Sequence, residues 1–211
     1  MPLFYALMHG DLATAFSFIL GIALAITVHE FAHAKIADWA GDPTPRKAGR
    51  VTLNPLAHYD PIGTTLILLF GMGWGKPVPV NPFNFRRPRE DEVLVSAGGA
   101  AANLVLAVIF GMLLRFSLVP EVYRHLAFFI VELNVMLAVF NLIPLWPLDG
   151  SHVLVGLLQR EPARKVALFY QTHGITPLIV FLLAMNILRV PILMYPIDLL
   201  VRLIAGPAAG F

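Results

Sequence analysis

The segment over residues 12–28 most constrains the fold, because it is a run of seventeen residues without a charged side chain. An α-helix needs about 20 predominantly apolar residues to cross the hydrocarbon core of a bilayer. The Gly-Asp-Pro sequence at residues 41–43 is typical of a helix terminus. We therefore predict a first membrane-spanning helix from about Asp11 to Trp39.

The composition of the whole chain points the same way. Hydrophobic residues make up 58% of its 211 residues, charged residues make up 13%, and the mean hydropathy is +0.75, values outside the range of ordinary soluble domains. The pI of about 9.1 does not indicate nucleic acid as a partner, because the basic residues form no long run. The chain has no cysteine, which excludes thiolate chemistry, disulfides and cysteine-ligated metal.

Further apolar segments predict an all-α polytopic membrane protein, a bundle of about four to six transmembrane segments. Residues 93–114 and 125–143 have the length of a span. Residues 61–74 are short and rich in glycine, so we expect them to re-enter or to lie at the interface, with a crossing as the alternative. Residues 176–205 form either one kinked span or two short ones.

A small β or re-entrant region associated with the membrane is expected over about residues 45–85. Within it, the alternating prolines of residues 76–81 rule out a helix and predict an edge strand. The whole chain, residues 1–211, is expected to form one integral membrane domain. Its functional core would cover about residues 11–155, followed by a C-terminal helical region at about 174–205.

The basic residues predict the orientation of the chain. Ten of the fifteen Lys and Arg residues lie in three connections, residues 41–60, 75–92 and 159–165. One topology places all three connections on the side that carries excess positive charge, the cytoplasmic side. We therefore expect a multi-pass protein of the cell membrane, whose first helix exits, and whose third span ends, at the cytoplasmic face.

The sequence His29-Glu30-Phe-Ala-His33 places two imidazoles and a carboxylate in the first span. On an α-helix, His29 and His33 lie one turn apart on the same face and can bind a single ion, whereas Glu30 lies about 100° around the helix. This is the H-E-x-x-H arrangement of zinc peptidases. The alternative, that both histidines bond carbonyl groups at the membrane interface, leaves Glu30 unexplained.

Asp149 is the candidate third ligand of one Zn²⁺ ion per chain. Pro144 and Pro147 end the third span and leave Asp149 on irregular backbone at membrane depth. Such backbone is tolerated only where it packs against protein or lines a cavity. Two histidines and one aspartate would leave a fourth position open for water. Alternatively, Asp149 caps a helix that begins near Ser151. Asn103, a carboxamide inside the second span, needs a partner and is expected to face the same interior.

Three motifs together resemble the site-2 protease family of intramembrane zinc metalloproteases, in a short prokaryotic form. They are His29-Glu30-x-x-His33, Ser96-Ala-Gly98 with Asn103, and Asn141-x-x-Pro144-x-x-Pro147-Leu148-Asp149-Gly150; the segments Gly49-Arg50-x-Thr52-x-Asn54-Pro55 and His58-x-Asp60-Pro61-x-Gly63-Thr64 fit the short members. The resemblance covers residues 20–155. It implies that His29, His33 and Asp149 bind zinc, that Glu30 is the general base, and that Asn103 and Asn141 orient substrate or the oxyanion. The family's usual Gly-Pro reads Gly98-Gly99 here.

The expected function is that of an intramembrane zinc endopeptidase. Zinc would lower the pKa of its water, and Glu30 would take the proton and return it to the leaving amine. The expected partners are a membrane-protein substrate with a single transmembrane helix and the lipid bilayer. One alternative is a metal transporter or metal-binding membrane protein that uses the same three ligands, which gives Glu30 no role. Another is a catalytically inactive family member that acts as a binding partner.

Overall fold

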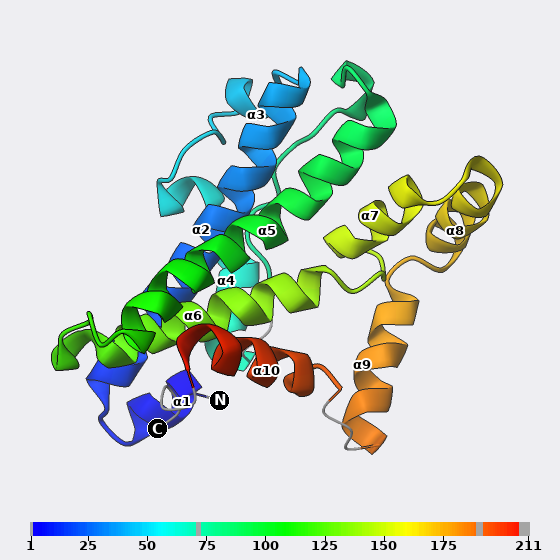
Figure 1. Cartoon of the computed structure of the whole chain (residues 1–211). Coiled ribbons are helices and arrows are strands. Elements are labelled where there is room, and N and C mark those ends of the chain that lie inside the picture. The colour runs from blue at the N-terminus through cyan, green and yellow to red at the C-terminus, as the bar shows by residue number, and fades with distance from the viewer. Residues whose placement is uncertain (1, 71–72, 189–191, 207–211) are drawn as a thin grey trace.

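The computed structural model describes residues 2–70, 73–188 and 192–206. These residues form helices and connections and contain no β-strand. The elements, shown along the chain in Figure 1, are α1 (Pro2–Met8), α2 (Leu12–Ala40), α3 (Thr44–Lys47), η1 (Pro55–His58), α4 (Pro61–Phe70), η2 (Pro82–Asn84), α5 (Pro88–Arg115), α6 (Glu121–Asn141), α7 (Asp149–Leu157), α8 (Arg160–His173), α9 (Thr176–Leu188) and α10 (Met194–Ala205).

Three helices, α2, α5 and α6, are long and apolar enough to cross a membrane. A fourth span is present if α8 and α9, which meet at a bend of 79°, count as one. The structure therefore fits the low end of the expected four to six segments. The reason is that α4, α9 and α10 have only 10, 13 and 12 residues, and α4 is about 15 Å long, which is too short to cross.

Helix α2 begins and ends where its sequence predicts. The Asp11 side chain caps its first turn by accepting a hydrogen bond from the Thr14 N–H at 3.0 Å. Gly41 ends it with a φ of +111°, a left-handed conformation that glycine adopts without a Cβ penalty. The predicted helix over residues 11–39 is therefore confirmed to within one residue.

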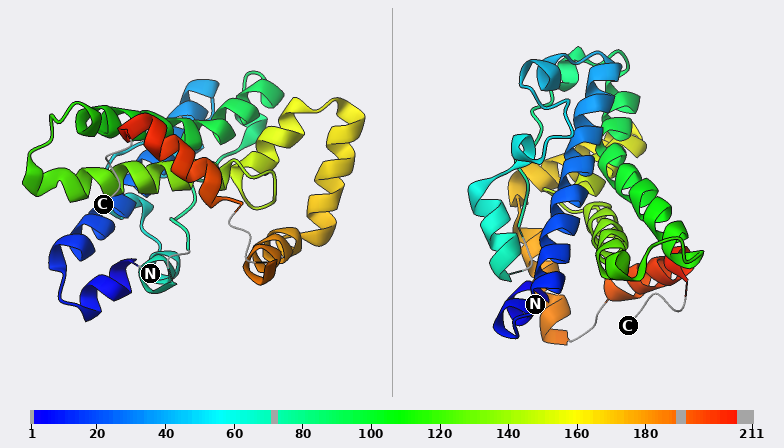
Figure 2. Two further views of the ribbon diagram at one scale, coloured as in Figure 1. Left: turned by 60° about the horizontal axis from the view of Figure 1, so that its bottom comes forward. Right: turned by 90° about the vertical axis from the view of Figure 1, so that its left-hand side faces the viewer.

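Helices α2, α5 and α6 pack against one another, and α10 packs across α5 and α6 (Figure 2). Glycines allow close approach at two of these contacts. A Cβ on Gly98 of α5 would lie 2.3 Å from Cδ1 of Ile36 in α2. A Cβ on Gly111 would lie 2.2 Å from Cγ2 of Ile204 in α10. Helices in lipid associate through close packing of this kind, because lipid tails are as apolar as the side chains and no hydrophobic effect drives the helices together.

An extended segment, residues 75–81, crosses α2 beside the histidines, and we refer to it as the strap. Gly75 lies directly on α2, since a Cβ there would be 2.6 Å from Cγ2 of Ile26. The Lys76 N–H donates to the His58 carbonyl oxygen at 2.8 Å. The strap is extended, as predicted. It does not form the predicted edge strand, because no β-ladder partner for it is present among the described residues.

Helix α7 packs against α5, and helices α8 and α9 extend away from the three long helices as an arm (Figure 1). Helix α9 has one buried residue, Leu178, and several exposed apolar ones, which suit contact with lipid. Helix α10 returns to pack Ile197 and Val201 against α5 and α6. The region predicted as one kinked span or two short ones thus contains two separate helices, with residues 189–191 outside the described part.

Candidate metal centre

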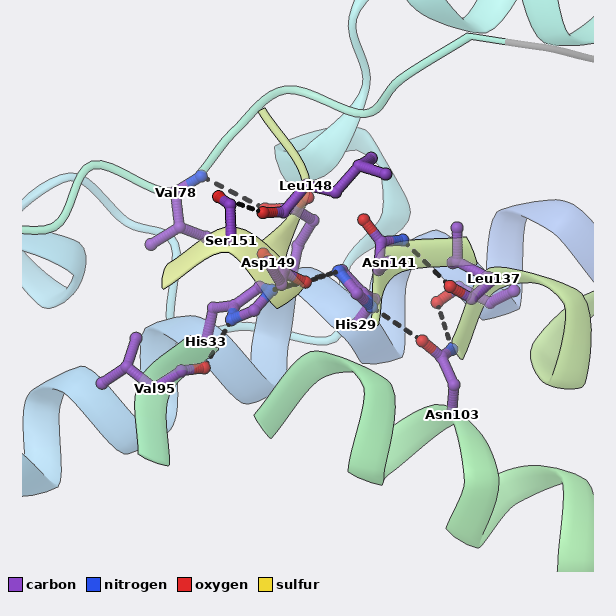
Figure 3. A network of polar contacts seen from close by, with 12 residues as sticks. His29, His33, Val78, Val95, Asn103, Leu137, Asn141, Leu148, Asp149 and Ser151 are labelled. Atoms are coloured by element: carbon purple, nitrogen blue, oxygen red, sulfur yellow. Dashed lines mark hydrogen bonds and ion pairs between the residues drawn. The ribbon is translucent and has the colours of Figure 1, made fainter. Parts of the chain in front are cut away.

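Three ligand atoms from two distant segments converge in the interior (Figure 3). Nε2 of His29 lies 3.1 Å and Nε2 of His33 lies 3.3 Å from Oδ2 of Asp149. The two Nε2 atoms are 3.0 Å apart. Ligands at 2.0–2.1 Å from a tetrahedral zinc ion are roughly 3.3 Å apart, so the three atoms have the spacing of a metal site. The structure thus brings together the three residues that the sequence names as candidate ligands, in a group that could hold one metal ion.

The hydrogen bonds of the two imidazoles explain why these atoms need a cation between them. Nδ1 of His33 faces the Val95 carbonyl oxygen at 2.7 Å, and Nδ1 of His29 faces Oδ1 of Asn103 at 2.7 Å. Since both oxygens can only accept, each Nδ1 carries the hydrogen, and each Nε2 of a neutral ring presents a lone pair. Oδ2 of Asp149 is buried and has no hydrogen-bond partner. Three lone pairs thus face one another, which a zinc ion would satisfy.

Backbone packing holds Asp149 at the centre. It is the first residue of α7, after an irregular segment from Leu142 to Leu148. A Cβ on Gly150 would lie 2.3 Å from the Leu142 carbonyl oxygen, so only glycine allows this approach. The Ser151 hydroxyl donates to the Leu148 carbonyl oxygen at 2.7 Å. The alternative role of Asp149 as a helix cap is not observed, because Leu148 occupies the cap position.

The centre is enclosed on one side and open on the other. The side chains of His29 and His33 are 7% and 11% exposed, whereas the Asp149 side chain is 22% exposed. Helix α5 forms the enclosed wall, since a Cβ on Gly99 would lie 2.5 Å from Nε2 of His33 and 2.6 Å from Cε1 of His29. The glycine that replaces the family's usual proline therefore packs directly on the ligands.

Glu30 lies beside the ligand group without being part of it. Its carboxylate is half-buried, and its Oε2 accepts a hydrogen bond of 3.1 Å from the Val78 N–H of the strap. Val78 is labelled at the edge of the site in Figure 3. The strap thus fixes the orientation of a carboxylate next to the ligand group.

Arg50 holds the strap in this place. It is 4% exposed and donates to the carbonyl oxygens of Lys76 and Pro77, the latter at 2.9 Å. His58 supports the arrangement, since its Nε2 bonds the Thr52 carbonyl oxygen at 2.8 Å. The sequence indicates that residues 76–81 form a strand that could pair with an extended substrate peptide, but it assigns no role to Arg50 or His58. The signal for them was the Gly49-Arg50 motif of the resemblance, to which no role had been attached.

The two asparagines with an expected role in substrate binding, Asn141 and Asn103, differ in how far they are exposed. Asn141, the last residue of α6, is partly exposed near Asp149 and donates to the Leu137 carbonyl oxygen at 3.0 Å (Figure 3). Asn103 is fully buried behind His29, and both ends of its amide are bonded to protein groups. The substrate role of both residues stays a prediction. Asn134 of α6, which contacts Asn103, was not among the predicted site residues.

Comparisons with known proteins agree with this site. The model of peptidase family M50 matches residues 117–185. YwhC of Bacillus subtilis (strain 168), a candidate zinc metalloprotease, is 41% identical over 150 residues, which are 66% of this chain and 68% of YwhC. Two mycobacterial candidate zinc metalloproteases called Rip2 are also similar. The Mycolicibacterium smegmatis protein is 34% identical over 71% of this chain and 60% of its own length, and a Mycobacterium tuberculosis protein is 30% identical over 78% and 66%.

No solved structure matches the chain. The family match begins after α5 and includes Asp149, whereas the H-E-x-x-H motif lies in α2, outside the matched residues. The family match and the geometry of the three ligands therefore support the same site from different segments of the chain. Together with the three converging ligands and the apolar long helices, the identity to YwhC leads to one assignment. The chain belongs to peptidase family M50, the site-2 protease family, and is a membrane zinc metalloprotease.

Proposed function

We propose that this protein is an intramembrane endopeptidase that hydrolyses peptide bonds of transmembrane or membrane-proximal segments with Glu30 as the general base. The observation that carries the proposal is the position of Glu30. It follows the ligand His29 directly, does not join the ligand group, and is oriented by the Val78 N–H. A metal transit site would have no use for a carboxylate oriented in this way.

The residues divide the chemistry between them. His29, His33 and Asp149 would hold the zinc ion, which supplies Lewis acidity toward water and toward a carbonyl oxygen. The Val78 hydrogen bond occupies Oε2 of Glu30 and leaves Oε1 to take a proton from the attacking water. Glu30 then gives that proton to the amide nitrogen that leaves. The enclosed wall of α5 keeps bulk water away from the histidine side of the centre.

The strap would receive the substrate as an extended chain. A peptide bond inside a helix is shielded by its own hydrogen bonds, so a substrate helix must unwind before hydrolysis. Pro77 and Pro79 have no N–H and the Val78 N–H already donates to Glu30, which leaves the Val80 N–H as the donor for a substrate strand in the middle of the strap. Residues two apart in an extended chain face the same side. Since Val78 faces Glu30, a substrate strand would pair along the side of the strap that faces the metal centre.

The expected substrate is a membrane protein with a single transmembrane helix, cut near the cytoplasmic face of the cell membrane. The support for this orientation is the set of basic connections at 41–60, 75–92 and 159–165, which follow the positive-inside pattern. The first connection follows the end of α2, and the second contains the strap next to the metal centre. The third lies at the start of α8, after Asp149 in the chain.

The test uses purified protein reconstituted with a panel of single-span substrates. Glu30→Gln is expected to keep its zinc and to lose cleavage by at least about 100-fold, the size of effect of a general base. Glu90→Gln, an exposed glutamate on α5, is the matched control and should keep full activity. Full activity of Glu30→Gln would refute the proposal. Metal flux into liposomes that survives in Glu30→Gln but is lost in His33→Ala would favour the transporter alternative.

A further inference from the structure

A second group of polar side chains lies behind the metal ligands, between α2, α5 and α6. Asn103 of α5 and Asn134 of α6 are both 0% exposed. Two carboxamides in the interior of a membrane helix bundle are costly unless their polar atoms find partners. The proposed chemistry uses neither of them, so their bonding requires an explanation.

The hydrogen bonds run in one direction, and the backbone sets that direction. The Ile130 carbonyl oxygen can only accept, so Nδ2 of Asn134 donates to it at 2.7 Å. Oδ1 of Asn134 is then an acceptor, and Nδ2 of Asn103 donates to it at 2.7 Å. The same nitrogen of Asn103 donates to the Ala25 carbonyl oxygen at 2.9 Å. The remaining end of the Asn103 amide, its oxygen, faces Nδ1 of His29 at 2.7 Å.

The last bond decides the tautomer of His29. Because Oδ1 of Asn103 accepts, Nδ1 of His29 carries the hydrogen and Nε2 is free to bind the ion. A rotated Asn103 amide would present its NH₂ group to Nδ1, favour the other tautomer, and place a hydrogen on Nε2. His33 does not need such control, since its Nδ1 donates to the backbone oxygen of Val95.

We propose that Asn134 is a positioning residue for the metal centre, which together with the Ala25 carbonyl oxygen fixes the orientation of the Asn103 amide and thereby keeps Nε2 of His29 available to zinc. We refer to Asn134, Asn103 and His29 as the relay. The relay joins α6 to α2 through α5, so the third long helix contributes to the metal centre without supplying a ligand. The inference rests on metal binding at this site and not on cleavage of any substrate.

The test measures zinc affinity of the purified full chain by competition with a chelator. Asn134→Leu has a similar volume but no polar atoms, and it should weaken zinc binding by about tenfold or more, as loss of an outer partner of a ligand does. Asn134→Asp should stay within about twofold of wild type. In the apolar interior its carboxyl is protonated, so its O–H donates to Ile130 and its second oxygen accepts from Asn103.

A matched control separates the relay from packing. Val135→Ala removes a fully buried side chain next to Asn134 on the same helix and should lower thermal stability without changing zinc affinity. Asn134→Ala provides a second variant in case Asn134→Leu does not yield monodisperse protein, and the same loss of zinc affinity is expected for it.

A double-mutant cycle tests the direction of the relay. In Asn103→Asp both terminal atoms of the side chain are oxygens, so Nδ1 of His29 finds an acceptor in either orientation of the side chain. Asn134→Leu should therefore cause no further loss of zinc affinity in that background. Equal losses in both backgrounds, an unchanged affinity of Asn134→Leu, or an Asn134→Asp variant as weak as Asn134→Leu would overturn the proposal. Because the readout is zinc affinity, failure of the protease proposal leaves this test readable.

Discussion

Val78 donates its backbone N–H to Oε2 of Glu30 over 3.1 Å, although the two residues are separated by 48 positions in the chain. The bond joins two features with separate sequence signals, the H-E-x-x-H helix and the proline-alternating strap. It gives the Glu30 carboxylate a fixed orientation before any substrate is present, and such preorganisation is what makes a general base effective. The strap is therefore part of the candidate active site.

The first prediction concerns Arg50, which bonds the carbonyl oxygens of Lys76 and Pro77. Arg50→Met should lower kcat by about 10- to 100-fold, because a small displacement of the strap misplaces Glu30. Zinc content should stay at the wild-type level, since Arg50 does not contact a ligand. Arg50→Lys keeps the charge but not the forked donors, so it should be only partly active.

The Arg50 variants are measured by initial rates of substrate cleavage together with metal analysis of the same samples. Lys47→Met, an exposed cation on the same connection, is the control and should leave kcat unchanged. If Arg50→Met cleaved as fast as the Lys47→Met control, the strap would not position Glu30 through Arg50.

The second prediction concerns Gly150, whose missing Cβ lets α7 begin against the end of α6. In Gly150→Ala the new Cβ would meet two backbone oxygens, those of Leu142 and Ile143, at 2.3 and 2.5 Å. Backbone cannot rotate away, so Asp149 must shift, and zinc binding should weaken by about tenfold or more. Gly156→Ala in the same helix meets only the end of the Val93 side chain, at 2.3 Å. That variant should bind zinc like the wild type, and equal affinities for both variants would contradict this account.

The third prediction is an acid-dependent loss of stability at Asp42, which lies outside the long helices. Burial acts to raise the pKa of Asp42, but hydrogen bonds from Asn81 N–H at 2.7 Å, Thr44 Oγ1 at 2.6 Å and Asn84 Nδ2 at 2.8 Å lower it below the ordinary value. The stabilisation is therefore present above the unfolded pKa of about 3.9 and is lost as the pH falls toward the folded pKa.

Thermal unfolding in detergent between pH 3 and pH 7 checks this expectation. Asp42→Asn should lower the free energy of unfolding by about 1–3 kcal/mol at pH 7, because an amide cannot accept all the bonds that the carboxylate accepts. The difference from wild type should shrink below about pH 4, where the wild-type carboxyl becomes protonated. A constant difference across this range would show that Asp42 acts through packing alone.

The parts of the structure that could be predicted from the sequence are those set by local chemistry. Asp11 and Gly41 mark the ends of α2 because caps act within a few residues. His29 and His33 share a face because the helix has 3.6 residues per turn. Asp149 could be added to the two histidines as a third ligand because prolines end α6 and leave its carboxylate at membrane depth. An acidic side chain has few roles there other than that of a ligand.

The parts that could not be predicted depend on pairings between distant segments. The sequence around Asn134 does not indicate whether its side chain faces lipid or another helix. It also does not identify Asn103, 31 residues earlier, as the partner. The contact of Arg50 with the strap spans 26 and 27 residues and is made to backbone oxygens, which carry no side-chain signal. Whether residues 176–205 form one span or two could not be decided from the sequence either, because apolar composition does not reveal where a short helix such as α9 ends.

Asp149 is the first residue of α7, the helix that connects the three long helices to the arm of α8 and α9. One carboxylate therefore connects the histidines of α2 to a segment that begins more than a hundred residues later. A bound ion tethers the arm to the core, and linkage makes this relation reciprocal. Loss of zinc would remove this connection while the packing of α7 against α5 remains, and a force that draws α7 outward would weaken zinc binding.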